Sequence, residues 1–222
     1  MSIELRTSLL ENADGSAELT IGGTKVITSI SGPIEPKARQ ELPNQSSLEI
    51  IVRPATGLST TREKLIEDKL RSILQSVIIS YKYPRQLIQI IVQFCKVDEK
   101  TEYNVNELNA AINCCYFALI DADIALYSSF GSVVTCINSG NLIKEPTGDV
   151  LETSDSFHLS CFTIQDGKAN KLLSLESQGE FTESELFSVL SESVLDVEKL
   201  HGIQREFIED KINQDYIWKR QE

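Results

Sequence analysis

The chain has 222 residues, and its hydrophobic and charged fractions, 41% and 24%, are those of a folded globular protein. Its formal net charge of −12 argues against an independent nucleic-acid binder, because such proteins gain most of their affinity from basic groups that neutralise phosphates. No apolar run reaches the roughly 18 residues that a membrane span needs, and the start of the chain has no signal-peptide pattern. We therefore expect a protein of the cytosol or nucleus.

Three strands are predicted in the first third of the chain. Apolar and β-branched residues fill 16–21 and 24–30, and the Gly22-Gly23 pair between them suits a two-residue hairpin turn. A third strand is expected over 47–52, after a loop rich in proline and charge. These segments predict a small antiparallel sheet.

A helix and a buried strand are expected next. Thr60 followed by Glu63 is a capping-box signature at the start of a helix over 60–80. The residues at helical spacing are Leu65, Lys69, Leu70, Ile73, Leu74, Val77 and Ile78. The run 86–97 is too short and too rich in isoleucine and valine for another helix, which indicates a buried strand.

A second helix is expected over 105–126, where apolar residues recur at steps of three and four. Its predicted N-cap is Asn104 or Asn106. The apolar series is Leu108, Ile112, Cys115, Leu119 and Ala122. This composition is typical of a helix in a protein core.

The second half predicts three strands, over 131–137, 157–164 and 169–177, with a loop between the first two. Asp166-Gly167 joins the last two strands and is a strong hairpin signal. Because hairpins and helices are segregated rather than strictly alternating, the order predicts an α+β fold with mixed sheets.

A long final helix is expected to start at Thr182, which forms another capping box with Glu185, and to continue nearly to Trp218. The side chains expected to point inward are Leu186, Phe187, Leu190, Val194, Val197 and Leu200.

Cysteine and histidine usage indicates neither disulfides nor a metal site. The five cysteines are odd in number, lack C-x-x-C spacing and lie in apolar sequence, so we expect reduced core thiols. They are Cys95, Cys114, Cys115, Cys136 and Cys161. His158 and His201 have no cysteine or aspartate at ligand spacing and are interpreted as structural or surface groups. Phosphate-binding glycine loops and hydrolase motifs are missing.

Two charged regions leave a binding role open. Glu152 and Asp155 could hold Mg²⁺ or act in acid–base catalysis, although a solvated acidic loop explains them as well. Basic residues are concentrated in one early stretch, where a solvated helix face and contacts to single-stranded RNA are both reasonable interpretations. Those that lie before the first helix are Lys37, Arg39, Arg53 and Arg62.

Several segments, in this order along the chain, resemble the ribonuclease PH family. They are D-G-S-A from Asp14, G-P-I-E-P-K-A-R-Q-E over 32–41, T-T-R-E-K-L-I-E-D-K-L-R over 60–71, A-L-I-D-A over 118–122 and D-G-K from Asp166. The two long segments are similar in particular to an exosome ring subunit of that family. The resemblance implies the ribonuclease PH fold (ribosomal protein S5 domain 2-like), α+β with two related β-α halves and mixed sheets. It also implies a single ribonuclease PH-like domain over 1–222.

The resemblance further implies where catalytic groups would lie. In active members an arginine and a hydroxyl residue at the start of the central helix hold phosphate, and two aspartates assist. Counting back from Asp121, the phosphate-binding pair falls on Glu107 and Leu108, a carboxylate that repels phosphate and an isobutyl group that cannot bind it. The aspartates fall near Glu152 and His158, and His158 is not equivalent. We therefore expect no catalytic residues, no metal and no cofactor.

A basic cluster is the family feature whose residues remain. The resemblance places it near the segment that contains Arg53, and Arg62 and Lys64 match its basic character. Lys37 and Arg39 are second candidates for RNA contact.

By this resemblance we expect a non-catalytic structural subunit of the eukaryotic RNA exosome ring. It would line the RNA channel and hold its neighbours during 3′-to-5′ RNA processing and degradation, including rRNA processing and the turnover of mRNA and non-coding RNA. The expected partners are other ribonuclease PH-like ring subunits, S1/KH-type cap subunits, associated exosome nucleases and RNA in the shared channel, but no membrane. The nucleus, nucleolus and cytoplasm are the expected compartments.

Two alternatives remain open at this point. One is an active phosphate-dependent 3′-to-5′ exoribonuclease, which would release nucleoside diphosphates. The other is a Mg²⁺-dependent hydrolytic nuclease that uses Glu152 and Asp155.

Overall fold

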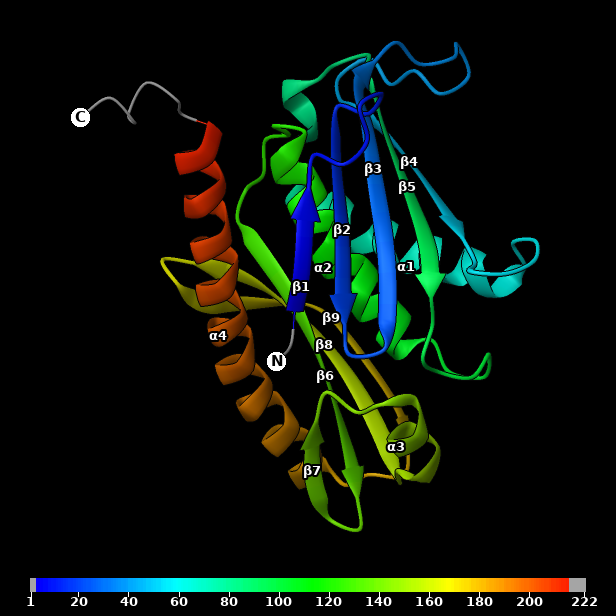
Figure 1. The fold of residues 1–222 in the computed structure, drawn as a ribbon, viewed down its shortest axis with the longest axis vertical. Helices are drawn as coiled ribbons and strands as arrows, with labels where there is room; N and C mark the ends of the chain where they lie inside the picture. Colours follow the sequence, from blue (N-terminus) through cyan, green and yellow to red (C-terminus); the bar gives the residue numbers. More distant parts are fainter. Residues whose placement is uncertain (1–2, 216–222) are drawn as a thin grey trace.

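The computed structural model describes residues 3–215 as two β-sheets with helices between and outside them (Figure 1). The strands are β1 (Ile3–Thr7), β2 (Gly15–Ile21), β3 (Thr24–Ile34), β4 (Ser47–Arg53), β5 (Leu87–Lys96), β6 (Ser129–Asn138), β7 (Asn141–Lys144), β8 (Ser156–Gln165) and β9 (Lys168–Gly179). The helices are α1 (Thr61–Val77), the short 3₁₀ helix η1 (Ser80–Lys82), α2 (Val105–Asp121), α3 (Gly148–Thr153) and α4 (Glu183–Asp215). The predicted continuation of the last helix to Trp218 lies outside the described residues.

The first sheet has the strand order β1-β2-β3-β5-β4 and is mixed, because β4 is parallel to β5. The second has the order β7-β6-β8-β9 and is antiparallel throughout. Helix α2 contacts strands of both sheets, α1 packs along β4, and α4 covers the second sheet (Figure 1). This arrangement confirms the predicted α+β class.

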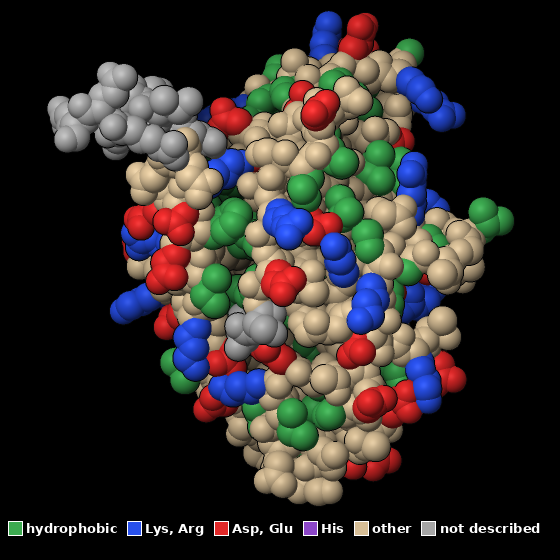
Figure 2. Space-filling model, viewed as in Figure 1, with side chains coloured by type: hydrophobic (Ala, Val, Ile, Leu, Met, Phe, Trp, Pro, Cys, Tyr) green, Lys and Arg blue, Asp and Glu red, His purple; other side chains and the backbone are tan. Residues whose placement is uncertain are grey.

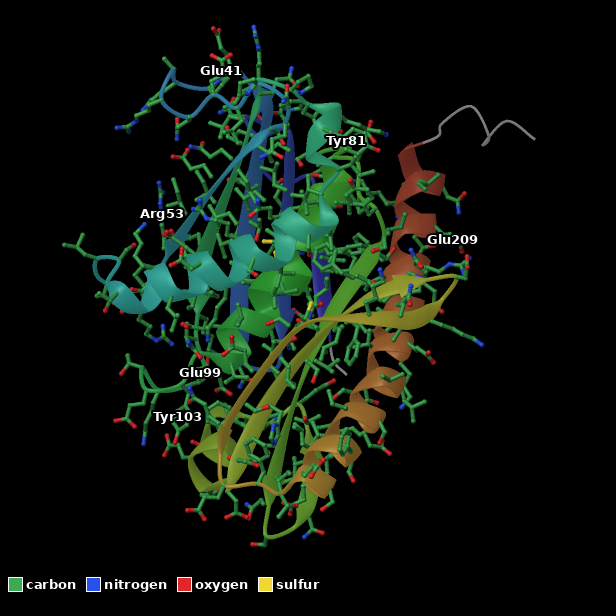
Figure 3. All side chains as sticks on the ribbon, turned by 180° about the vertical axis from the view of Figure 1, so that it is seen from behind. Glu41, Arg53, Tyr81, Glu99, Tyr103 and Glu209 are labelled. Carbon is green, nitrogen blue, oxygen red and sulfur yellow. The ribbon has the colours of Figure 1, made fainter. Side chains whose placement is uncertain are left out.

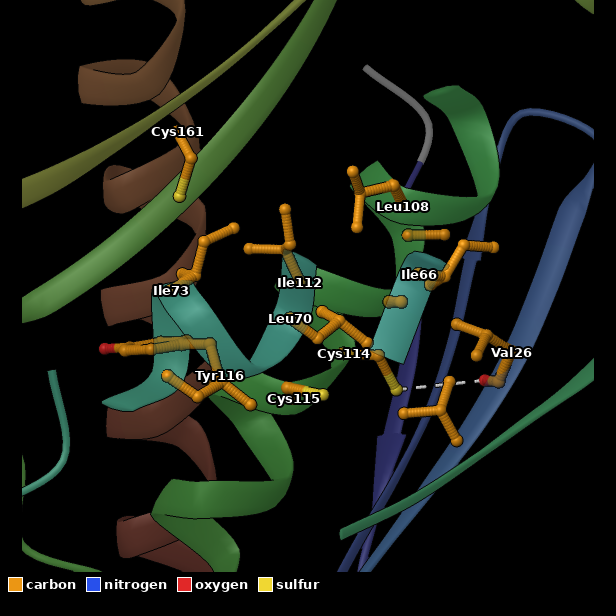
Figure 4. Packing of buried hydrophobic residues seen from close by; sticks show 14 of the residues in the cluster. Val26, Ile66, Leu70, Ile73, Leu108, Ile112, Cys114, Cys115, Tyr116 and Cys161 are labelled. Carbon is orange, nitrogen blue, oxygen red and sulfur yellow. Dashed lines mark hydrogen bonds between the residues drawn. The ribbon is translucent and has the colours of Figure 1, made fainter. Parts of the chain in front are cut away.

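The main core lies around α2, where it packs against α1 and the first sheet. Figure 4 shows side chains from these elements packed together, with Cys114 donating a hydrogen bond to the Val26 carbonyl oxygen. Cys114, Cys115, Cys136 and Cys161 are buried free thiols, as predicted. Burial raises the pKa of Cys114 to about 12, so this thiol stays protonated.

Both predicted two-residue turns are confirmed. Ile21 pairs with Thr24 across Gly22-Gly23, and Gly22 has φ +56. Gln165 pairs with Lys168 across Asp166-Gly167, whose φ angles of 52 and 79 are both positive. Positive φ angles at both central residues match the right-handed twist of the flanking strands.

Both predicted capping boxes are also present. The Thr60 backbone N–H donates to Glu63 Oε2 at 2.6 Å, and the Thr60 hydroxyl oxygen accepts from the first turn of α1. At α4, the Thr182 N–H donates to Glu185 Oε2 at 2.7 Å, and the Glu185 N–H returns a bond of 3.4 Å. Local sequence therefore fixes where these helices begin.

Some elements were not predicted. Strand β1 was missed because it is a short edge strand of mixed polarity. The loop expected after residue 137 contains β7 and α3. The α3 start depends on the Asp98 carboxylate, which accepts from the Gly148 N–H at 3.0 Å and lies far away in sequence. Helix α2 ends at Asp121, five residues earlier than predicted.

Two predictions of buried side chains, those for Cys95 and Phe187, were wrong, and Leu65 of the helical series is also exposed. Cys95 is exposed because a register shift between β3 and β5 leaves it without a pairing partner beside Phe94. Leu65 is 47% exposed and Phe187 is 62% exposed. Helix α4 touches the sheet along a narrow stripe that excludes Phe187. Its buried residues are Val189, Ser193, Val197, Leu200 and Gln204.

No helix within residues 3–215 is long and apolar enough to cross a membrane.

Candidate functional site

The start of α2 meets the first turn of α1 and the loop 97–104, and the residues that join them form the candidate site, which we call the α2-start site. It consists of Arg62, Glu99, Glu107 and Leu108. Figure 3 shows Glu99 and Tyr103 together beside the start of α2. The site contains both positions to which the family resemblance assigns phosphate binding.

Arg62 connects the three segments of the site. Its Nε donates to the Thr101 carbonyl oxygen at 3.0 Å, and its Nη2 donates to the Tyr103 carbonyl oxygen at 2.6 Å. The Nη2 atom also lies 2.5 Å from Glu107 Oε2. The Arg62 side chain is only 20% exposed. The charge of Arg62 is therefore neutralised inside the fold, contrary to the expectation of a basic group free to contact RNA.

Glu99 caps α2. Its Oε1 accepts from the Glu107 N–H at 2.8 Å, and its Oε2 accepts from the Asn106 N–H at 3.2 Å. The prediction of Asn104 as the N-cap residue is confirmed, but its side chain makes no cap hydrogen bond, and the Asn106 amide donates to Pro146 O. Because a helix start attracts anions through its free N–H groups and its dipole, Glu99 occupies the place where an external anion would bind.

Two buried carboxyl groups face each other in this site. Burial, with a smaller contribution from the nearby Glu107, raises the pKa of Glu99 to about 7, although the two N–H groups that Glu99 accepts and Arg62 oppose the shift. Burial also raises the pKa of Glu107, and its bond to Arg62 opposes that shift. Both exposed fractions are small, 8% for Glu99 and 2% for Glu107. Arg62 therefore balances a negatively charged, poorly solvated cluster.

Leu108 belongs to the core. It is 1% exposed and lies in the same cluster as Ile66 and Ile112 (Figure 4). A side chain at this position points among apolar groups and has no access to a ligand in solution. These apolar surroundings are consistent with the predicted loss of a phosphate-binding group at this position.

Glu152 and His158, near which the resemblance places the two aspartates, have partners outside the α2-start site. Glu152 on α3 forms an ion pair with Lys100 at 2.6 Å. His158 is fully buried on β8 between the hydroxyl groups of Ser156 and Ser177, at 3.1 and 2.9 Å. Burial lowers the pKa of His158, so its ring is neutral at neutral pH. Its structural interpretation is supported.

Glu152 and Asp155, the predicted acidic pair, bind different partners. Asp155 accepts from the Ser139 N–H at 2.6 Å, in the turn after β6, while Glu152 faces Lys100. Among residues 3–215 there is no group of three His, Cys, Asp or Glu side chains that could hold a metal ion.

The five predicted RNA contacts fall into two groups at opposite ends of β4. Lys37 and Arg39 lie in the loop before this strand, whereas Arg53 ends the strand and Arg62 and Lys64 follow in the first turn of α1. Seven residues of strand separate the groups by about 20 Å. Lys64 is exposed but paired with Glu67 at 2.6 Å. Figure 2 shows basic and acidic side chains interspersed on the face that it presents, with no continuous basic tract.

The model of the 3′ exoribonuclease family, domain 1, matches residues 2–125. The chain belongs to the ribonuclease PH family. The family predicted from the sequence motifs is thereby confirmed, and the matched residues include all four residues of the α2-start site.

Curated relatives of this ribonuclease PH chain cover nearly its whole length. It is 44% identical to the exosome complex component RRP46 of Saccharomyces cerevisiae over 218 residues, which is 96% of this chain and 98% of that protein. It is 32% identical to exosome complex component rrp46 of Schizosaccharomyces pombe, over 94% and 90% of the two chains.

A solved structure shares the fold of this chain. The crystal structure of rice (Oryza sativa) Rrp46 matches with a TM-score of 0.84 and covers 94% of both chains, at 23% sequence identity. The predicted ribonuclease PH fold is confirmed by this likeness.

Glu99 is the functional residue that sequence reasoning missed. It lies in the polar stretch D-E-K-T-E-Y-N, which looks like an ordinary surface loop. Its separation of seven residues from Asn106 allows the loop to fold back on the helix start, but this spacing alone does not identify Glu99 as the cap. Nothing in the local pattern distinguishes it from Glu102.

Proposed function

We propose that this chain is a non-catalytic subunit of a eukaryotic RNA exosome ring. In this role it supports 3′-to-5′ RNA processing and degradation by holding neighbouring subunits and lining part of an RNA channel. The relatives named as exosome complex components RRP46 support the assembly role, because they align with nearly the whole chain.

The single observation that carries the non-catalytic assignment is the closed start of α2. Glu99 accepts both N–H groups that a phosphate would need, and Arg62 is held by Glu107 and two carbonyl oxygens. An approaching phosphate would meet two carboxyl groups and an apolar Leu108, and so would be repelled rather than bound. Phosphorolysis requires bound phosphate, so the α2-start site serves the fold rather than a reaction.

The proposed partners follow from this role. Other ribonuclease PH-like exosome subunits would flank the chain in the ring, with S1/KH-type cap subunits on one face and associated exosome nucleases supplying hydrolysis. The proposed compartments are the nucleus, nucleolus and cytoplasm. RNA would reach this chain only within the shared channel, which fits the net charge of −12.

Within the channel, we assign RNA contact to Arg53 and Lys64 in one group and to Lys37 and Arg39 in the other. All four side chains lie on exposed positions. Arg62 is reassigned to holding the α2-start site. Because the two groups lie about 20 Å apart, one extended RNA strand could contact both only by following β4.

The test is the native mass and subunit stoichiometry of the complex that contains the tagged chain, purified from cells that express it. One copy of the chain among different ribonuclease PH-like and cap subunits is the expected result. A ring made only of this chain, releasing nucleoside diphosphates from RNA in a phosphate-dependent reaction, would contradict the proposal and favour the exoribonuclease alternative.

A further inference from the structure

A pocket of about 370 Å³ opens at the far end of α1 from the α2-start site. It lies between the last turns of α1, the start of β4 and the loop that precedes β4. We call it the corner pocket; its lining includes Gln40, Leu48, Glu49, Arg71, Ile78 and Leu87. None of the functional assignments above uses this pocket.

The lining combines an apolar floor with neutral hydrogen-bonding walls. Leu48, Ile78 and Leu87 supply the apolar part, and glutamine and serine side chains supply most of the rest. The one acidic group, Glu49, already accepts amide bonds from Gln40 at 3.0 Å and from Gln89 at 2.6 Å. These neutral donors satisfy the Glu49 oxygens without neutralising their charge, so an incoming anion has to bind on the Arg71 side of the pocket.

Arg71 is the charged group of the pocket that remains available. Its Nη1 reaches the Leu48 carbonyl oxygen at 3.5 Å, which is a weak hydrogen bond. Within the described part of the chain Arg71 makes no ion pair, and its side chain is exposed. Its remaining N–H donors are arranged to bind a carboxylate in a two-pronged manner.

The pocket also adjoins an open edge of the first sheet. The Ser47 N–H donates inward to Gln86 O, so the backbone groups of the next residue, Leu48, face away from β5. At the other end of β4 this outer edge is closed, since Glu67 accepts from the Val52 N–H at 3.0 Å. At the pocket end, the Leu48 carbonyl oxygen accepts only the long bond from Arg71, so this end of the strand is where an added extended segment would pair.

Two exposed tyrosines lie at the same corner. Tyr81 and Tyr127 are 61% and 57% exposed, and their ring centroids are 6.3 Å apart. Backbone bonds hold their segments together, from the Tyr127 N–H to Val77 O and from the Ile79 N–H to Ala125 O. Rigid, exposed tyrosines are typical of protein interfaces, because ordering them on binding loses little entropy.

We propose that the corner pocket binds an extended segment of another protein in which an apolar residue and an acidic residue are two positions apart, so that both side chains lie on the same face of the added strand. The apolar side chain enters the pocket, the carboxylate binds Arg71, and the backbone pairs with the outer edge of β4 at Leu48. Arg71 supplies the positive charge for this carboxylate, because the loop before β4 carries as many acidic as basic side chains, Glu35 and Glu41 beside Lys37 and Arg39. A single arginine over an apolar floor favours a peptide over RNA, which needs several phosphate contacts.

The test measures binding of fluorescein-labelled peptides to the full-length chain by fluorescence anisotropy. The probe is a peptide that repeats leucine-serine-aspartate-serine, and in its control lysine replaces each aspartate. Oligouridylate serves as the RNA competitor. The variant is Arg71→Glu, and the matched control is Arg205→Glu, which makes the same charge change at an exposed position on α4. Circular dichroism establishes that both variants are folded.

The expected result is that only the aspartate peptide binds and that Arg71→Glu weakens it by about tenfold or more. Arg205→Glu should leave the affinity unchanged, and Tyr81→Ala should reduce it by a smaller factor. In ¹⁵N spectra, the amides of Ser47 and Leu48 should shift on titration. The proposal is overturned if the aspartate peptide does not bind, if both charge reversals weaken it equally, or if oligouridylate displaces it from the same residues.

Discussion

Two arginines of α1 lie in opposite environments. Arg62, in the first turn, is 20% exposed and bound by Thr101 O, Tyr103 O and Glu107. Arg71, toward the last turns, is exposed and makes one long bond to Leu48 O. The same residue type in one helix is therefore structural at one end and available for binding at the other. Burial and the supply of internal partners decide the role, not the charge itself.

The largest effect is expected from Leu108→Arg, which places a charge in the core next to the closed site. Leu108 is 1% exposed, so the variant should lose more than about 4 kcal/mol of unfolding free energy or fail to fold. Urea unfolding followed by far-UV circular dichroism measures this. Leu108→Met is the control and should lose less than about 1.5 kcal/mol. An arginine variant as stable as the methionine variant would mean that this position opens to solvent.

Arg62→Ala should lose about 3 to 5 kcal/mol, because it leaves the buried Glu107 carboxylate and two carbonyl oxygens without their partner. The matched control is Lys64→Ala in the same turn, whose exposed pair with Glu67 should contribute about 1 kcal/mol or less. Urea midpoints of the two variants give the comparison. Equal losses would show that Arg62 is an ordinary surface residue.

Both arginines lie in the segment 60–71 that resembles the ribonuclease PH family, but the sequence could not separate their roles. Their local contexts, T-R-E-K and L-R-S-I, contain no information about Tyr103 or Glu107, which lie about forty residues away. Capping boxes and hairpin turns were predicted because their bonds join neighbours in sequence. The Glu99 cap was missed because its partners were brought together by folding of the whole first half.

Motif order was sufficient for the family and the fold, because spaced segments such as 32–41 and 60–71 preserve their positions in one architecture. Short or irregular elements such as α3 were not predictable, since the Asp98 carboxylate that caps α3 comes from a distant loop. Phe187 was assigned inward from periodicity alone, yet α4 buries a stripe too narrow to include it.

A pH effect should come from Glu99. Its pKa is raised in the folded chain from 4.5 to about 7, so the folded state binds more protons than the unfolded state between these values. Stability from this group is therefore full below pH 4.5 and is lost as pH rises to 7, by up to about 3 kcal/mol. Glu99→Gln should remove this slope, whereas Glu180→Gln, at an exposed position, should keep it. His158, whose pKa is lowered by burial, gives stability the opposite dependence on pH, but it is present in every variant, so the comparison between variants cancels its contribution. Parallel curves for wild type and Glu99→Gln would contradict the account.

The smallest effect on stability is expected at the other end of α1. Arg71→Glu should change the free energy of unfolding by less than about 0.5 kcal/mol, because its side chain is exposed and weakly bonded. Urea unfolding of this variant beside Arg62→Ala gives the contrast directly. A loss comparable to that of Arg62→Ala would mean that Arg71 holds the fold, and the comparison between the two arginines would fail.

The closed α2-start site is tested most directly by phosphorolysis. The purified chain, alone and in its native complex, is incubated with 3′-end-labelled RNA and inorganic phosphate, and released nucleoside diphosphates are measured. We predict no phosphate-dependent release by the chain alone at any concentration, because Glu99 fills the anion position. Sustained release that increases in proportion to the concentration of this chain would contradict the account and show that phosphate enters the site.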